Sequence, residues 1–172
     1  MSFKVTRDAL SPALAKMAEE CRDPRAILEA MGNALVGVTK GSFNIPSLRA
    51  APWAPMKKQG GAPLKASGAL WHSIRITSLE SREVTVGTDR TYASYQQFGT
   101  RPYTIRPKVK TALFWPGAPG PRKGVHHPGL PPRPFFPFDA SGNMTAGARK
   151  TVEDAGRAKL AKILRGAGGN PA

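Results

Sequence analysis

Apolar side chains recur at helical spacing near the start of the chain. A first stripe, which predicts a helix over residues 10–21, consists of Leu10, Leu14, Met17 and Cys21. The spacing is interrupted at Asp23-Pro24, where a capping side chain is followed by a residue suited to the first helical turn. A second helix is therefore predicted from there to Gly41, since glycine favours a helix end. Its apolar face comprises Ile27, Met31, Leu35 and Val38.

The centre of the chain changes from a helical to an extended pattern. Residues 67–74 predict a short helix capped by Ser67, with Leu70 and Ile74 on one side. Residues 75–88 then predict a β-hairpin with a turn at Ser81-Arg82, because apolar residues recur there in an imperfect alternation. These residues are Ile76, Leu79, Val84 and Val86.

Three aromatic residues then recur at a spacing of three, which places their rings along one side of a short helix that Gly99 ends. They are Tyr92, Tyr95 and Phe98. Residues 104–115 predict two further extended segments, and residues 144–164 predict a final helix. The larger apolar residues of that helix are Val152, Leu160, Ile163 and Leu164.

Stretches rich in proline and glycine separate these elements. Eleven of the twenty residues from 115 to 134 are Pro or Gly, and residues 44–66 carry four prolines and the pair Gly60-Gly61. Both stretches are predicted to be extended loops or arms, and residues 166–172 a flexible tail. At 172 residues, the chain suits one domain. We predict a single α+β domain, with an antiparallel β-sheet packed against the N-terminal and C-terminal helices and long Pro/Gly-rich loops.

The chain is strongly basic. It has 26 Lys and Arg residues against 11 Asp and Glu, a net charge of +15. Such a surplus attracts polyanions or acidic protein surfaces, although it also keeps a soluble protein apart from its neighbours. Residues 105–115 interleave cations with aromatic side chains, as single-strand binders do, while none of the familiar nucleic-acid-binding motifs is present. A basic DNA-binding accessory protein is therefore an alternative function.

The residues that catalysis or metal binding requires are sparse. There is no carboxylate between Glu29 and Glu80 or between Asp89 and Asp139, which disfavours paired-acid chemistry and a small hydrolase. The adjacent His126-His127 pair has no third ligand at a recognisable spacing, and a hydrogen-bonded corner is its simpler role. We therefore expect no enzyme activity, no metal and no cofactor.

The sequence also indicates where the chain is made. Cys21 is the one cysteine, so no disulfide can form within the chain, and a reducing cytoplasm suits it. No apolar run approaches the roughly 20 residues that a membrane-spanning helix needs. We expect no contact with a membrane.

Three motifs in order resemble the phage virion morphogenesis family, the tail-completion and neck proteins of tailed bacteriophages. The family pattern runs L-x-x-S-G-x-L-x-x-S-I, then V-G-T and Y-A-x-x-x-Q-F-G, then H-P-G-x-x-x-R-P-F. Gln96 stands where the family often has His. The matching residues are Leu64, Ser67, Gly68, Leu70, Ser73 and Ile74; Val86, Gly87 and Thr88; Tyr92, Ala93, Gln97, Phe98 and Gly99; and His127, Pro128, Gly129, Arg133, Pro134 and Phe135.

The resemblance implies a structural virion protein at the head–tail junction, with a ring of copies, a hexamer, as the expected assembly. Its expected partners are copies of itself and other neck, connector or tail proteins, with non-specific contact with passing DNA. Aromatic and amide side chains suit such contacts because they bury area without importing charge. The alternative for Tyr92 and Phe98 is a place in the chain's own core. The interface candidates are Trp53, Met56, Tyr92, Tyr95, Gln96, Gln97, Phe98, His127, Arg133 and Phe135.

Overall fold

The computed structural model of this protein describes residues 18, 23–55, 64, 67–117, 119–139 and 141–168. Apart from Ala18, which is helical, the helix predicted over residues 10–21 lies outside the described residues. The interface candidate Met56 also lies outside them.

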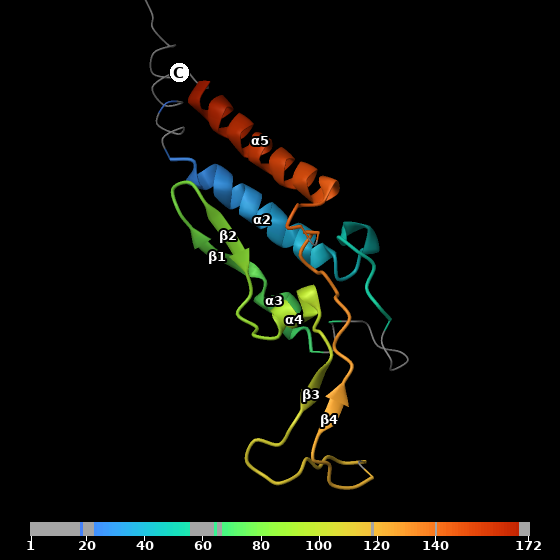
Figure 1. The fold of residues 1–172 in the computed structure, drawn as a ribbon. Helices are drawn as coiled ribbons and strands as arrows, with labels where there is room; N and C mark the ends of the chain where they lie inside the picture. The colour runs from blue at the N-terminus through green and yellow to red at the C-terminus, as the bar shows by residue number, and fades with distance from the viewer. Residues whose placement is uncertain are drawn as a thin grey trace, which may run out of the picture.

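Two long helices and a β-hairpin form a stack in which one helix is the middle layer. Helix α2, Arg25–Gly41, lies antiparallel to helix α5, Ala146–Gly168 (Figure 1). Strands β1, Arg75–Leu79, and β2, Val84–Gly87, pair antiparallel and pack against α2 on the side away from α5. The predicted α+β class is confirmed, with helices from both ends of the chain.

Helix α2 forms where the apolar stripe predicts it. Asp23 accepts a hydrogen bond from the backbone N–H of Arg25 at 3.2 Å and so supplies one of the missing partners of the first turn. The same carboxylate binds the Arg25 side chain, and this hydrogen bond is the largest cause that lowers the pKa of Asp23. The helix ends at Gly41, as predicted.

The hairpin has an irregular register that explains its imperfect sequence pattern. Ile76 lies opposite Val86, and Leu79 opposite Val84, but the register shifts by one residue between Ile76 and Ser78. A bulge of this kind breaks the period-two alternation of side chains.

Glycine in α2 allows the helix and the hairpin to approach closely. A Cβ atom on Gly32 would lie 2.6 Å from Cγ2 of Val84 and 2.9 Å from Cδ1 of Ile76. Real Cβ atoms do not come this close, so the hairpin packs directly against the helix backbone at this point.

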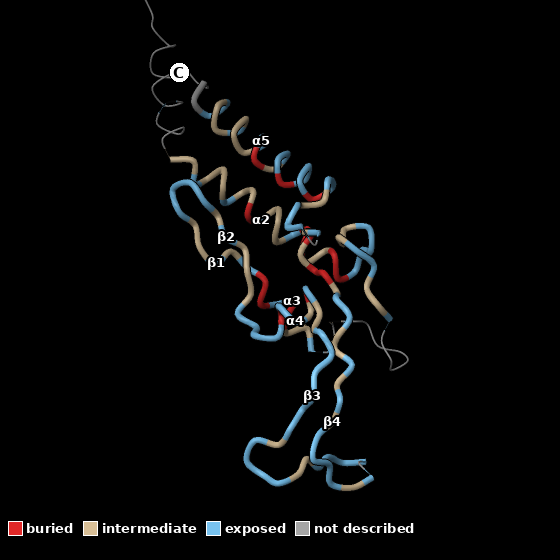
Figure 2. The backbone as a smooth tube through the Cα atoms, viewed as in Figure 1, coloured by how far each residue is buried: buried red, intermediate tan, exposed pale blue. Residues whose placement is uncertain are grey.

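The core lies at the C-terminal end of α2. Two short helices, α3 at Ala69–Ser73 and α4 at Ala93–Phe98, and the single turn η1 at Pro46–Leu48 surround it. Figure 2 shows the buried residues concentrated there and along the facing sides of α2 and α5. The buried cluster consists of Phe43, Leu70, Ile74, Ala93 and Phe135.

A second, separate hairpin extends from this body as an arm, which we define as residues 100–130 (Figure 1). Strand β3, Tyr103–Ile105, pairs antiparallel with β4, Val125–His127. This pairing corrects the fold predicted from the sequence in two respects. The described strands form two two-stranded sheets instead of one sheet, and β4 lies inside the stretch predicted as a loop.

Two element boundaries also differ from the sequence prediction. Gly68 is the N-cap of α3, and the hydroxyl of Ser67 is a distant acceptor for the Ala69 N–H, at 3.4 Å. Helix α5 continues to Gly168, into the stretch predicted as a tail. Gly166 and Gly168 are weak helix formers, so the sequence predicts an end before this last turn.

We expect opposite effects from alanine at two glycines of α2. Gly37 has no atom within 4 Å of its would-be Cβ, so Gly37→Ala should raise the free energy of unfolding by about 0.5–1 kcal/mol through helix propensity. Gly32→Ala should lower it by about 1 kcal/mol, because overpacking against Val84 outweighs the same gain. Urea unfolding of both variants measures the difference, and equal shifts would contradict the close packing.

Candidate functional site

Helix α4 is attached to the core through the side chain of Gln97. Its Oε1 atom accepts hydrogen bonds from the backbone N–H groups of Phe135 at 2.9 Å and Phe136 at 3.0 Å. Its Nε2 atom donates to the carbonyl of Phe136 at 3.5 Å. Gln97 is buried, so this amide supplies partners for backbone groups that water does not reach. The amide acts inside the chain instead of on its surface.

Phe135 is held on its other side by helix α2. The hydroxyl of Ser42, just after the helix, donates to the carbonyl of Phe135 at 2.8 Å. The Phe135 ring lies 5.9 Å from the ring of Phe43 and 4.9 Å from that of Phe136. Phe135 is 1% exposed, so it belongs to the interior and offers no surface to a partner.

Trp53 and Arg133 connect the segment after η1 to the segment before Phe135. The indole N–H of Trp53 donates to the carbonyl of Pro134 at 2.8 Å, and its ring meets the Phe43 ring edge-on at 5.6 Å. Arg133 Nε donates to the carbonyl of Ala54 at 3.1 Å. Both side chains are half-buried, so most of what they contact belongs to their own chain.

The three rings of α4 lie on the outside of the molecule. Tyr92, Tyr95 and Phe98 are exposed, Phe98 by 74%, while Ala93 and Gln97 face inward. The alternative that Tyr92 and Phe98 fill the chain's own core is therefore wrong. Gln97 faces inward because its amide accepts hydrogen bonds from the backbone of Phe135 and Phe136.

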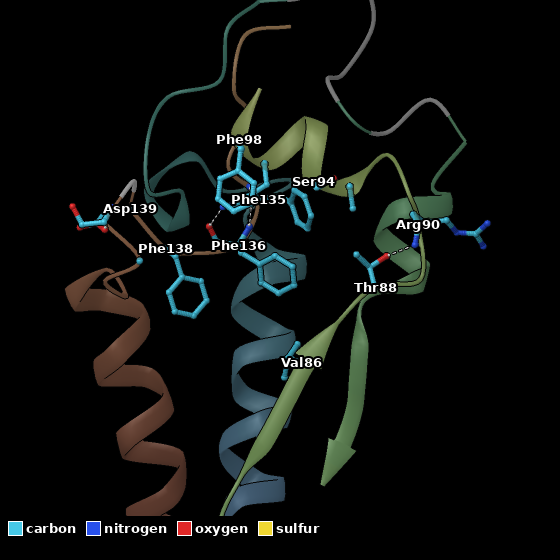
Figure 3. A pocket seen from close by; sticks show the side chains of 13 residues that line it. Val86, Thr88, Arg90, Ser94, Phe98, Phe135, Phe136, Phe138 and Asp139 are labelled. Atoms are coloured by element: carbon cyan, nitrogen blue, oxygen red, sulfur yellow. Dashed lines mark hydrogen bonds between the residues drawn. The ribbon is translucent and has the colours of Figure 1, made fainter. Parts of the chain in front are cut away.

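An open apolar pocket of about 730 Å³ lies between α4, β2 and the segment after Phe135. Figure 3 shows Phe98, Phe136 and Phe138 around it, with Val86 at its base. The rings of Phe136 and Phe138 are 6.5 Å apart. A pocket with this lining suits apolar side chains of a partner.

The pocket has a carboxylate at its edge. Asp139 accepts hydrogen bonds from the backbone N–H groups of Asn143 at 2.8 Å and Ser141 at 2.9 Å. The bond from Asn143 is the largest cause that holds the pKa of Asp139 below its ordinary value, against an opposing effect of burial. Asp139 therefore stays ionised at neutral pH.

The arm exposes apolar and cationic side chains together. Tyr103 and His127 lie opposite each other, with stacked rings 4.9 Å apart. The Nδ1 atom of His127 accepts a hydrogen bond from the Gly129 N–H at 3.0 Å, so the hydrogen-bonded corner expected of the histidine pair is present. Further exposed apolar residues follow β3, and sequence reasoning did not select them as interface residues: Val109, Phe114 and Trp115.

The candidates thus divide into an outer and an inner group. Tyr92, Tyr95 and Phe98 form one outer face, whereas Gln97 and Phe135 are interior. The interior role of Gln97 had little signal in the sequence, because a glutamine is compatible both with a subunit interface and with a hydrogen-bonded interior position.

The described residues show neither a metal-binding cluster nor a membrane-spanning helix. They contain no group of three or more His, Cys, Asp or Glu side chains that could hold a metal ion. Within the described part, no helix has the length and apolar character to cross a membrane.

Comparison with known proteins gives one positive finding. The model of the phage virion morphogenesis family matches residues 5–161, most of the chain. Neither the curated proteins nor the solved structures gave a match.

We expect the adjacent glutamines of α4 to respond oppositely to leucine. Gln97→Leu leaves one buried and one part-buried N–H group without an acceptor, so the free energy of unfolding should fall by about 2–4 kcal/mol. Gln96→Leu removes an Oε1 atom that is buried and has no hydrogen-bond partner among the described residues, and should be neutral or slightly stabilising. Denaturant unfolding with circular dichroism measures both, and equal losses would contradict the interior role of Gln97.

Proposed function

We propose, since the chain belongs to the phage virion morphogenesis family, that it is a structural protein of the head–tail junction of a tailed phage. There it completes one end of the neck or tail, so that head and tail join and DNA passes between them. Membership of the family itself indicates a role in building the virion.

The observation that carries the proposal is the aromatic surface that the chain leaves uncovered. Tyr95 and Phe98 on α4 are exposed beside an apolar pocket, and Tyr103, Phe114 and Trp115 are exposed on the arm. Large exposed aromatic side chains close to a hollow are typical of protein–protein contact sites. The function therefore consists of contacts between subunits, without a chemical reaction.

The proposed partners are copies of the same chain, arranged as a ring of six, and other neck, connector or tail proteins. Rings arise when one surface of a subunit binds a different surface of the next and the rotation closes. The arm and the body of this chain are two such different surfaces, well separated in space (Figure 1).

A second candidate function, a basic DNA-binding accessory protein, is favoured by the charge of the arm. The arm carries six cations and no carboxylate: Arg101, Arg106, Lys108, Lys110, Arg122 and Lys123. If phosphate contacts dominate, affinity for a random duplex falls with a slope near −0.9 per phosphate on a log–log plot against salt. Gel shifts across a salt series therefore measure this candidate directly.

We expect phage that encode Tyr95→Ser with Phe98→Ser to make heads and tails that seldom join. Both side chains are exposed, so the fold should survive, whereas loss of two aromatic contacts should weaken docking by roughly 30-fold or more. Electron microscopy of lysates, with counts of joined and separate particles, measures the effect.

The matched control is Ile45→Ser, which removes an exposed apolar side chain outside both the pocket and the arm. It should leave particle yield unchanged. Normal joining by the double variant, or immunogold labelling of the chain away from the neck, would contradict the proposal.

A further inference from the structure

The arm has an apolar face without a core beneath it. By the β3–β4 register, Tyr103 lies across from His127, and Ile105 across from Val125, so these four side chains share one face of the ribbon. All three residues of β3 are exposed. A two-stranded ribbon is at best marginally stable alone in water, so this face needs a covering partner.

The body of the same chain does not cover this apolar face, because backbone hydrogen bonds hold the base of the arm in one position. The N–H of Thr100 donates to the carbonyl of Leu130 at 3.0 Å, and the N–H of Leu130 donates to the carbonyl of Thr100 at 3.2 Å. Gly99 and Gly129 have φ values of 72° and 85°, where residues with a side chain are strained.

Space at this base is equally restricted. A Cβ atom on Gly99 would lie 2.6 Å from the carbonyl oxygen of Leu130, and one on Gly129 would collide with that of Thr100. One further hydrogen bond, from the Arg133 N–H to the carbonyl of Gln96 at 2.7 Å, ties the segment after the arm to α4. The arm therefore points away from the body of its own chain (Figure 1).

The charges favour contact between an arm and a body over contact between two arms. Six cations lie on the arm, and all eleven carboxylates of the chain lie outside residues 90–138. Among the described residues, no arm cation is within salt-bridge distance of a carboxylate. Two arms placed face to face would repel each other. The charged residues that line the pocket are the ionised Asp139 and Arg90, and Arg90 already pairs with Asp89 at 3.3 Å, so Asp139 is the carboxylate open to an arm cation.

We propose that the apolar face of the arm of one copy docks into the pocket of the next copy. Tyr103 and Ile105 enter between Phe98, Phe136 and Phe138, and arm cations lie near Asp139. The volume of about 730 Å³ has room for more than one large side chain. The inference rests on the proposed assembly of copies and deepens it, because it names the two surfaces that meet.

The contact is heterologous, since each copy gives an arm and receives one. Successive copies are then related by one repeated rotation, and a chain of such contacts closes into a ring or continues as a filament. A two-fold contact between identical surfaces would instead stop at a dimer.

Two variants of the full chain test the contact. Tyr103→Ser with Ile105→Ser disables the arm and leaves the pocket intact. Phe98→Arg disables the pocket, because it removes an exposed ring and places a cation opposite the basic arm. Ile45→Ser is the control, and circular dichroism verifies that each variant is folded.

We expect the wild-type chain and the control to form oligomers in sedimentation velocity, and each variant to associate at least about 30-fold more weakly. An equal mixture of the two variants should form a species of two chains and nothing larger. In that mixture, the intact arm of one variant enters the intact pocket of the other, and no further pairing is possible.

Several outcomes would overturn the inference. These are wild-type chain that remains monomeric at about 100 μM, an arm variant that assembles normally, and a mixture that remains monomeric. The inference would also be overturned if the arm binds nucleic acid instead of a second copy. In that case Arg106→Gln with Lys108→Gln would abolish duplex binding, whereas Tyr103→Ser with Ile105→Ser would assemble normally. The proposed function stands or falls separately, on whether particles that lack the chain still join heads to tails.

Discussion

The backbone of Phe135 is the point on which the rest of the structure depends. Gln97 accepts its N–H, Ser42 donates to its carbonyl, and its ring fills the buried cluster beside Phe43. An unpaired buried backbone group costs about 1–3 kcal/mol. These bonds therefore join the end of α2, helix α4 and the segment after the arm into one unit, and they place the pocket beside the base of the arm.

In this arrangement, the side chains that stabilise the fold differ from the side chains that lie on the surface. Polar side chains in the interior, such as Gln97 and Ser42, satisfy the backbone, while rings that would ordinarily fill a core lie on the surface. Tyr95 and Phe98 lie on the outer side of the same short helix that Gln97 anchors. A helix fixed so firmly presents its rings in one orientation, which lowers the entropy lost on docking.

Much of the fold could be predicted from the sequence, because its signals are local. The apolar stripe of α2 and the alternation in β1 and β2 come from residues close together in the chain. Strand β4 could not be predicted in this way, because its partner β3 lies about twenty residues away and its flanking prolines and glycines favour a loop. The inner role of Gln97 was hidden for a similar reason, since its partners lie 38 and 39 positions further along.

The closed base of the arm has a consequence for how such a chain can vary. Beyond the hydrogen-bonded pair Thr100 and Leu130, the described residues between Val109 and Gly120 lie away from the helices, and none of them belongs to the buried cluster. Its length can therefore change without strain reaching the helices. The tip is where a peptide epitope or a fluorescent label could be inserted to follow the protein inside a growing particle.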